Sequence, residues 1–241
     1  MRRWRVTHLC LGVMGGLLTA ALAQAAVVYD SNGFEPNTFV LGSLSSQDGW
    51  TATGSATVEN FLVQSGSQAV AILSDTSGYE ALRVSPDAAP IVVLSVGVNL
   101  LLNPTAASTW GLVGLNPSGN PLGGILILPD GTLQMVSPGG GTTTPLITRG
   151  AWNTVQLLLD FGTSSFDVFL NGTAVQTGVP FANTGTFLTG AVASTGGGGD
   201  LLFLDNYAVT DVPAVPEPST LALLIVGATA FTVRFRSLKQ L

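Results

Sequence analysis

Short runs of apolar and β-branched residues, separated by Gly, Pro, Asn and Asp, fill the central part of this 241-residue chain. Runs of this kind predict β-strands. The longest, residues 91–102, is continuously apolar, and Gly97 within it is expected to form a β-bulge. No stretch of useful length has the 3.6-residue period of an amphipathic helix. We therefore predict about twelve strands, at residues 56–63, 68–73, 79–84, 91–102, 110–115, 122–128, 132–136, 152–161, 166–170, 173–177, 186–194 and 201–210.

Two of the predicted turns have specific residue chemistry. Pro129-Asp130-Gly131 predicts a tight turn between two strands. Asn171-Gly172 suits a type I′ hairpin, which also accounts for the glycosylation-like triplet there. Many strands with no intervening helix and no fixed repeat predict an all-β sandwich of two antiparallel sheets.

Residues 1–26 have the pattern of a secretory signal peptide. Arg2, Arg3 and Arg5 precede an apolar run at residues 9–22, and small residues follow at the spacing that signal peptidase requires. We expect cleavage after Ala25 or Ala26. An uncleaved N-terminal anchor is the alternative.

The C-terminal segment, residues 213–241, combines a rigid turn, an apolar run and a basic end. The turn is Pro216-Glu217-Pro218, and the apolar run predicts a transmembrane helix at about residues 219–235. The basic residues of the end at 234–241 are expected to stay on the inner side of the membrane. A buried core helix is the alternative. The basic residues are Arg234, Arg236 and Lys239.

These three parts, in this order at the extreme C-terminus, closely resemble the PEP-CTERM sorting signal of exported bacterial proteins. The resemblance covers about a tenth of the chain. It implies that an exosortase removes the tail at or near Pro216, Glu217 and Pro218, with Arg234 and Arg236 in the basic end. It also implies a Gram-negative bacterium that makes exopolysaccharide, with the protein at its surface or in that matrix. It assigns no biochemical activity.

Removing both terminal segments changes the chemistry that the chain offers. The single His and the single Cys leave with the signal peptide, which excludes a Ser-His-Asp triad, a Cys nucleophile and a histidine-bound metal in the body. Two basic and thirteen acidic residues remain, a net charge of about −11. This charge argues against nucleic acid as a partner. No disulfide can form.

The body, residues 27–212, resembles concanavalin A-like (laminin-G-like) jelly rolls. The paired strands Trp152–Asp160 and Phe166–Gly172 carry the resemblance, together with Asp48-Gly49-Trp50 near the start and Leu204–Tyr207 near the end. In many folds of this superfamily a structural calcium sits where the first and last strands meet. By that analogy Glu35 and Asp205 are the first candidate ligands for Ca²⁺ and Asp30 is the second. The alternative is that Asp205-Asn206 only turns the chain.

A carboxylate pair is the common catalytic option that remains, as in glycosidases. The three Glu residues of the body, Glu35, Glu59 and Glu80, lie far apart in sequence, and no Glu-x-Asp-x-x-Glu pattern occurs. Asp160 and Asp167 are interpreted as strand-end and turn residues.

Carbohydrate binding requires exposed aromatic rings beside polar groups. Trp50 and Trp110 are the candidates for such platforms, with a place in the core as the alternative, whereas Trp152 is expected in the core. The Gly-rich stretches 139–141 and 196–199 lack the helix and Lys of a phosphate site and are expected to be rim loops.

The prediction is therefore an exported protein of the cell surface or matrix, membrane-anchored at least before processing. Its expected role is non-catalytic, as a binding or structural module associated with exopolysaccharide. The alternatives are a polysaccharide-active enzyme and a protein–protein adhesion scaffold.

Overall fold

The computed structural model describes residues 26–52, 55–74, 78–84, 93–105, 107–186, 189–195 and 200–212. The predicted signal peptide, apart from Ala26, and the whole predicted transmembrane helix lie outside the described residues. Within the described part, no helix is long and apolar enough to cross a membrane.

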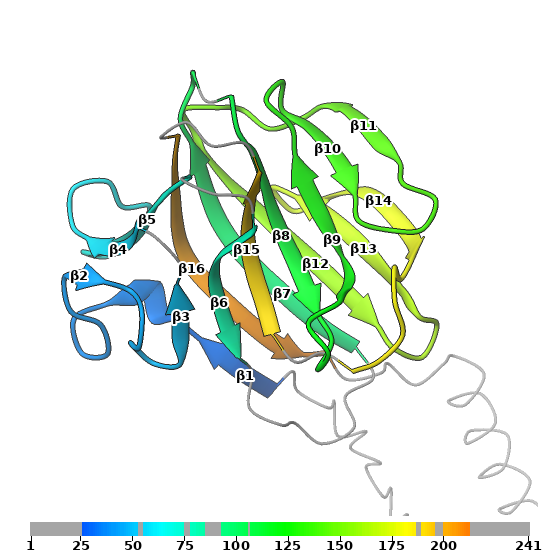
Figure 1. Cartoon of the computed structure of the whole chain (residues 1–241), viewed down its shortest axis with the longest axis horizontal. Coiled ribbons are helices and arrows are strands. Elements are labelled where there is room, and N and C mark those ends of the chain that lie inside the picture. Colours follow the sequence, from blue (N-terminus) through cyan, green and yellow to red (C-terminus); the bar gives the residue numbers. More distant parts are fainter. Residues whose placement is uncertain are drawn as a thin grey trace, which may run out of the picture.

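The described residues form two stacked antiparallel sheets (Figure 1). The larger has nine strands, and β1 (Ala26–Asp30) lies beside β16 in it. The order of the other eight is β14 (Thr173–Pro180), β13 (Ser165–Leu170), β12 (Trp152–Asp160), β7 (Val93–Leu102), β16 (Leu201–Asp211), β5 (Ala69–Leu73), β4 (Ser55–Glu59) and β2 (Gly42–Ser43).

The smaller sheet has seven strands. Their order is β11 (Thr142–Pro145), β10 (Thr132–Met135), β9 (Pro121–Ile127), β8 (Thr109–Leu115), β15 (Thr189–Thr195), β6 (Gly78–Val84) and β3 (Trp50–Ala52). One 3₁₀ turn, η1 (Asn32–Phe34), follows β1. The predicted all-β sandwich of two antiparallel sheets is confirmed.

The core lies between the sheets and follows the two-residue period of the strands. In β12 the side chains of Val155, Leu157 and Leu159 are fully buried, and the residues between them face the outer side of the sheet. Burying each such side chain contributes about 1.5–3 kcal/mol relative to leaving it in water. One large cluster of this kind joins both sheets.

Both predicted turns are present. Asn171 and Gly172 have φ values of 50° and 78°, as a type I′ hairpin requires. At the other turn, Gly131 has φ 84° and its N–H donates to the Leu128 carbonyl at 2.9 Å.

Three details of the strand prediction were wrong. The strand expected at 56–63 ends at Glu59, because its carboxylate and two others bind the backbone of the following loop. The bulge expected at Gly97 lies instead in β16, between Asp205 and Ala208, while Gly97 pairs regularly with Gln156. Four strands, β1, β2, β3 and β11, were not predicted; three of them have only two to four residues, too few for a period to show.

Candidate ligand-binding surface and cation site

The candidate site lies where β16 stops pairing with β5 and starts pairing with β1. Residues 201–204 pair with β5, and residues 208–211 pair with β1. Between them, at Asp205 and Asn206, the ladder is interrupted, and Asn206 has φ 53°. The Asp205 side chain is fully buried there. The sequence brings a carboxylate to the junction of the first and last strands, as the jelly-roll resemblance implied.

Three carboxylates bind the backbone of the loop at residues 60–68. Each comes from a different place in the fold: Glu59 from the end of β4, Asp205 from β16, and Glu35 from the segment after η1. Glu59 accepts the N–H of Phe61 at 3.1 Å. Asp205 accepts the N–H groups of Gln64 at 3.0 Å and Ser65 at 3.1 Å. Glu35 accepts those of Ser67 at 2.7 Å and Gln68 at 3.3 Å. This loop, which we call the anchored loop, is therefore held along its whole length.

The three carboxyl groups have different electrostatic environments. Burial raises the pKa of Asp205, and the nearby charge of Glu35 raises it further. Burial also raises the pKa of Glu59, one of whose oxygens is buried without a hydrogen-bond partner. Hydrogen bonds from the Ser67 hydroxyl and N–H lower the pKa of Glu35. Folding therefore disfavours the charged form of Asp205 and Glu59 and favours the charged form of Glu35.

Replacing Glu59 by Gln tests this view of the anchored loop. Because the pKa of Glu59 is raised in the folded state, the folded protein keeps the proton of this carboxyl group at a pH where the unfolded chain has lost it. The contribution of Glu59 to the free energy of unfolding therefore falls as the pH rises above about 4.5. We expect Glu59→Gln to equal or exceed the wild type in free energy of unfolding at pH 7, and to lose that advantage below pH 4.5. Urea unfolding from pH 3.5 to 7 measures this. An advantage for the variant that grew toward low pH would contradict it.

Oxygens of three side chains converge beside Gly33 in η1. A Cβ atom placed on Gly33 would lie 3.3 Å from Oδ1 of Asn206, 3.5 Å from Oδ1 of Asp205 and 3.6 Å from Oε1 of Glu35. Two carboxylates and an amide carbonyl are hard oxygen donors of the kind that Ca²⁺ prefers. These residues fit a calcium ion, which would neutralise the two carboxylates.

Asp30, the second candidate ligand, ends β1 opposite Ala208. Its Oδ1 accepts the N–H of Asn32 at 2.7 Å and closes a local turn. Asn206 supplies the third converging oxygen instead, which the sequence interpretation missed. No group of three or more Asp, Glu, His or Cys suited to a metal occurs among the described residues.

Calcium is expected to stabilise the protein through these oxygens. A ligand that binds only the folded state at one hundred times its Kd contributes about 2.7 kcal/mol. We expect calcium to raise the Tm of the wild type relative to chelator, and Gly33→Ala to abolish the response, because the added methyl group fills the place between the oxygens. Gly42→Ala is the matched control: Gly42 also has positive φ, 117°, but nothing lies within 4 Å of its added Cβ. An equal calcium response in both variants would contradict this site.

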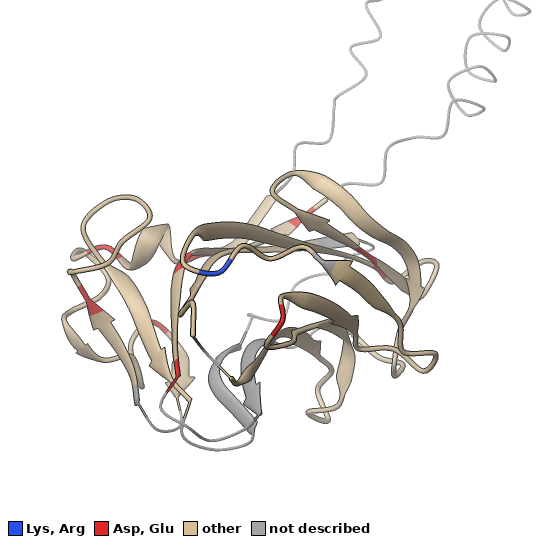
Figure 2. Ribbon diagram, turned by 90° about the horizontal axis from the view of Figure 1, so that it is seen from above, with Lys and Arg blue, Asp and Glu red and all other residues tan. Residues whose placement is uncertain are grey.

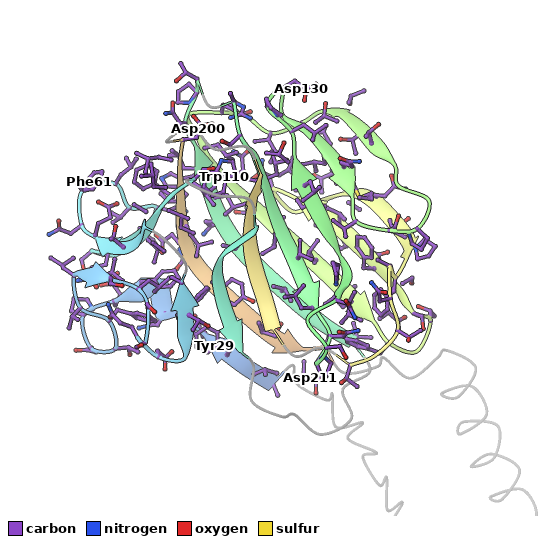
Figure 3. All side chains as sticks on the ribbon, viewed as in Figure 1. Tyr29, Phe61, Trp110, Asp130, Asp200 and Asp211 are labelled. Carbon is purple, nitrogen blue, oxygen red and sulfur yellow. The ribbon has the colours of Figure 1, made fainter. Side chains whose placement is uncertain are left out.

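The outer face of the larger sheet carries an apolar row across four strands. Trp152 pairs with Leu101, Leu101 with Phe203, and Phe203 with Ala71. These residues form a cluster separate from the one between the sheets, in which Ala71, Leu101 and Phe203 are buried and Trp152 is partly buried. Phe61 of the anchored loop is 72% exposed and packs edge-on against Phe203, with ring centroids 5.8 Å apart. Trp152 and Phe61 are therefore the rings of this row that a ligand can reach. Figure 3 shows Phe61 on the loop at one side of the sandwich.

A polar row runs beside the apolar row. Thr154 donates to Asn99 at 2.6 Å, and the amide nitrogens of Asn99 and Asn206 donate to Oε1 of Gln64 at 3.3 and 2.9 Å. Among the described residues, neither Nε2 of Gln64 nor the indole nitrogen of Trp152 has a partner, so both remain available as donors. We call the two rows together the outer strip: Trp152, Leu101, Phe203, Ala71 and Phe61 with Thr154, Asn99, Gln64 and Asn206.

The predicted aromatic platforms require a correction. Trp50 and Trp110 are each 1% exposed and lie in the core, so neither ring can meet a ligand. Trp50 packs against Phe34 and Tyr207 and donates to the Tyr29 hydroxyl at 3.0 Å. Trp152, expected in the core, is only partly buried and lies on the outer face. The reason is strand parity: Trp152 has the opposite orientation to Val155 in β12.

Three further acidic residues bind backbone N–H groups. Asp160 ends β12 and accepts N–H bonds from Gly162 and Thr163, as its interpretation as a strand-end residue predicts. Asp167 lies within β13 instead, and it accepts the N–H of Gly178 in β14, where the ladder between the two strands shifts register. Asp200 accepts the N–H groups of Ala107 and Ser108. In Figure 3, Asp130 and Asp200 lie at one end of the sandwich and Asp211 at the other. Residues 139–141 are exposed in a loop, and 196–199 lie outside the described residues.

Comparison with known proteins shows the fold alone. No protein-family model matches the chain, and no curated protein is similar to it in sequence. A sialidase structure is similar with a TM-score of 0.52 and 14% identity, over 67% of this chain and 17% of the other. The binding domain of botulinum neurotoxin serotype D has a TM-score of 0.51 and 8% identity, over 83% of this chain and 50% of that structure. The binding domain of botulinum neurotoxin DC in complex with SialylT has a TM-score of 0.50 and 12% identity, over 73% of this chain and 46% of that structure. This chain thus spans half or less of each of these structures.

Proposed function

We propose that this protein is an exported, non-catalytic module that associates with polysaccharide at the cell surface or in the extracellular matrix. The observation that supports the proposal most directly is the outer strip. A sugar ring has apolar C–H faces that pack on aromatic rings and hydroxyls that need hydrogen bonds. The outer strip offers both next to each other. Similar folds include a sialidase and a toxin binding domain in complex with SialylT, which is consistent with this ligand class.

The arrangement of the carboxylates favours binding over hydrolysis. A glycosidase needs two carboxyl groups about 5–9.5 Å apart with access to substrate. The near pair here, Glu35 and Asp205, is engaged by backbone N–H groups, and Asp205 is fully buried. A polysaccharide-active enzyme remains the second candidate because one similar fold is a sialidase. It predicts release of reducing ends from a polysaccharide that the protein binds.

We also propose that the C-terminal segment directs sorting by an exosortase. The support is the order of the turn at Pro216-Glu217-Pro218, the apolar run and the basic end in the sequence. Deleting residues 216–241 is expected to release the protein from the membrane fraction of a producing Gram-negative cell. Mass spectrometry of the mature wild-type protein is expected to find its C-terminus near residue 216. An intact Leu241 in the mature protein would contradict processing.

The binding proposal is tested by a glycan array and an exopolysaccharide pull-down with the purified full chain. The expected result is retention that weakens in Phe61→Ala, because Phe61 is exposed and its loss removes one ring of the outer strip. Val40→Ala is the control, since Val40 is comparably exposed at 67% but lies outside the strip. Absence of retention on every polysaccharide would refute the proposed function and leave the adhesion scaffold as the better account.

A further inference from the structure

We infer that the outer strip selects uncharged polysaccharide and rejects chains rich in uronate or sulfate. The inference rests on the proposed function and names the ligand class of the same surface. It follows from the charges around the strip and from the kind of hydrogen-bonding groups within it.

Within the part of the chain that the structure describes, the outer strip itself contains no Lys, Arg or His. Red acidic segments are scattered over the ribbon in Figure 2. Of the two basic residues in the described ranges, Arg83 lies in β6 of the smaller sheet and Arg149 lies in the loop after β11. The Arg149 guanidinium donates to the carbonyls of Asn103 and Leu128 at 3.2 and 2.9 Å. Asn103 follows β7 and Leu128 follows β9, so Arg149 bridges the two sheets at their edge.

In the calcium-free protein, the ionisable side chains that border the strip are acidic instead. Asp205 lies directly beneath the anchored loop, and Glu59 and Glu35 hold the two ends of that loop. Asp160 and Asp167 lie farther along the outer face of β12 and β13. The carboxylates that hold the anchored loop are the acidic groups nearest to the strip, whereas Asp160 and Asp167 lie at or beside the far end of β12 and are screened by salt.

The groups that face solvent in the strip are neutral amides, an indole and hydroxyls. Gln64 and Trp152 each have an N–H without a partner among the described residues. Trp152 lies beside Leu101 in the apolar row, and Gln64 lies beside Asn99 and Asn206 in the polar row. Hydrogen bonds from neutral donors to hydroxyl oxygens need no charge compensation. The ligand that matches these groups is a neutral glycan with its ring faces on Phe61 and Trp152.

The test compares immobilised neutral polysaccharides (a β-glucan, a galactan and dextran) with alginate and polygalacturonate. The purified full chain is used with chelator, at low and at high salt, because calcium bound to Glu35 and Asp205 would neutralise both carboxylates. We expect retention on at least one neutral polysaccharide, little changed by salt, and none on the uronates even at low salt. Phe61→Ala combined with Gln64→Ala is expected to weaken retention roughly tenfold or more. Trp152→Phe, which keeps an aromatic ring but removes the indole donor, is expected to weaken it less.

The outcomes separate the inference from the proposed function. Salt-sensitive retention on alginate would overturn the neutral class while leaving polysaccharide binding intact. The assignment to the outer strip would be overturned if all four variants bound a neutral polysaccharide as well as the wild type does. These are the strip variants Phe61→Ala and Gln64→Ala and the controls Val40→Ala and Leu146→Ala. Failure to bind any of these polysaccharides would overturn both.

Discussion

Asp205→Ala is expected to lower the free energy of unfolding by about 3–4 kcal/mol, because the substitution leaves buried N–H groups without an acceptor. The Asp205 carboxylate accepts three backbone N–H bonds, from Gln64, Ser65 and Asn206. It lies at the point where β16 passes from β5 to β1. Losing it frees the middle of the anchored loop. Urea unfolding at pH 7 measures the loss.

Two further variants separate burial from loss of hydrogen bonds. Asp160→Ala also removes an acceptor of two N–H bonds, but in an exposed turn where water replaces it, so a much smaller loss is expected. Asp205→Asn keeps the shape and removes the charge, and it should fall between the wild type and Asp205→Ala. Equal losses in Asp160→Ala and Asp205→Ala would contradict a special role for the buried carboxylate.

Gly124→Ala is expected to destabilise the protein by about 3–5 kcal/mol or to prevent folding, because the added methyl group collides with backbone rather than with a movable side chain. A Cβ on Gly124 in β9 would overlap the carbonyl oxygen of Leu112 and lie 2.8 Å from the Cα of Val113 in the paired strand β8. Its φ of 155° is also unfavourable for Ala. Neither strand can shift without disturbing the smaller sheet.

Gly97→Ala is the matched control in the larger sheet. Gly97 lies in β7, pairs regularly with β12, and has nothing within 4 Å of an added Cβ. Because Ala restricts the unfolded chain more than Gly, a change between zero and a gain of about 1 kcal/mol is expected. Thermal unfolding of the two variants side by side tests the comparison. Similar Tm values would contradict the close approach of β9 to β8.

The architecture was predictable because alternation and turn residues are local signals. Val155, Leu157 and Leu159 in β12 show the two-residue period directly, and Asn171-Gly172 fixes the hairpin that follows β13. The edge strands β2 and β3 were missed because two or three residues show no period. The run in β7 is continuously apolar, so its sequence does not show which of its residues face outward. The bulge was predicted at Gly97, but it lies in the paired strand β16, between Asp205 and Ala208.

The candidate site was predictable only in part. The pairing of Glu35 with Asp205 came from a resemblance to a superfamily, and the structure brings both carboxylates to one loop. The outer strip depends on strand register, which sets Trp152 beside Leu101 and Phe203. A tryptophan looks the same in sequence whether its strand turns it inward or outward. For this reason Trp50 and Trp110 were selected as platforms and Trp152 was not.

Hydrogen–deuterium exchange with and without a retained polysaccharide is the most direct measurement of the central claim, that the outer strip binds sugar. Binding at the outer strip predicts added protection in residues 60–68 and at the start of β12, where Phe61, Gln64 and Trp152 lie, and none in β10 and β11 of the smaller sheet. Protection confined to the smaller sheet, with residues 60–68 and the start of β12 unchanged, would contradict it.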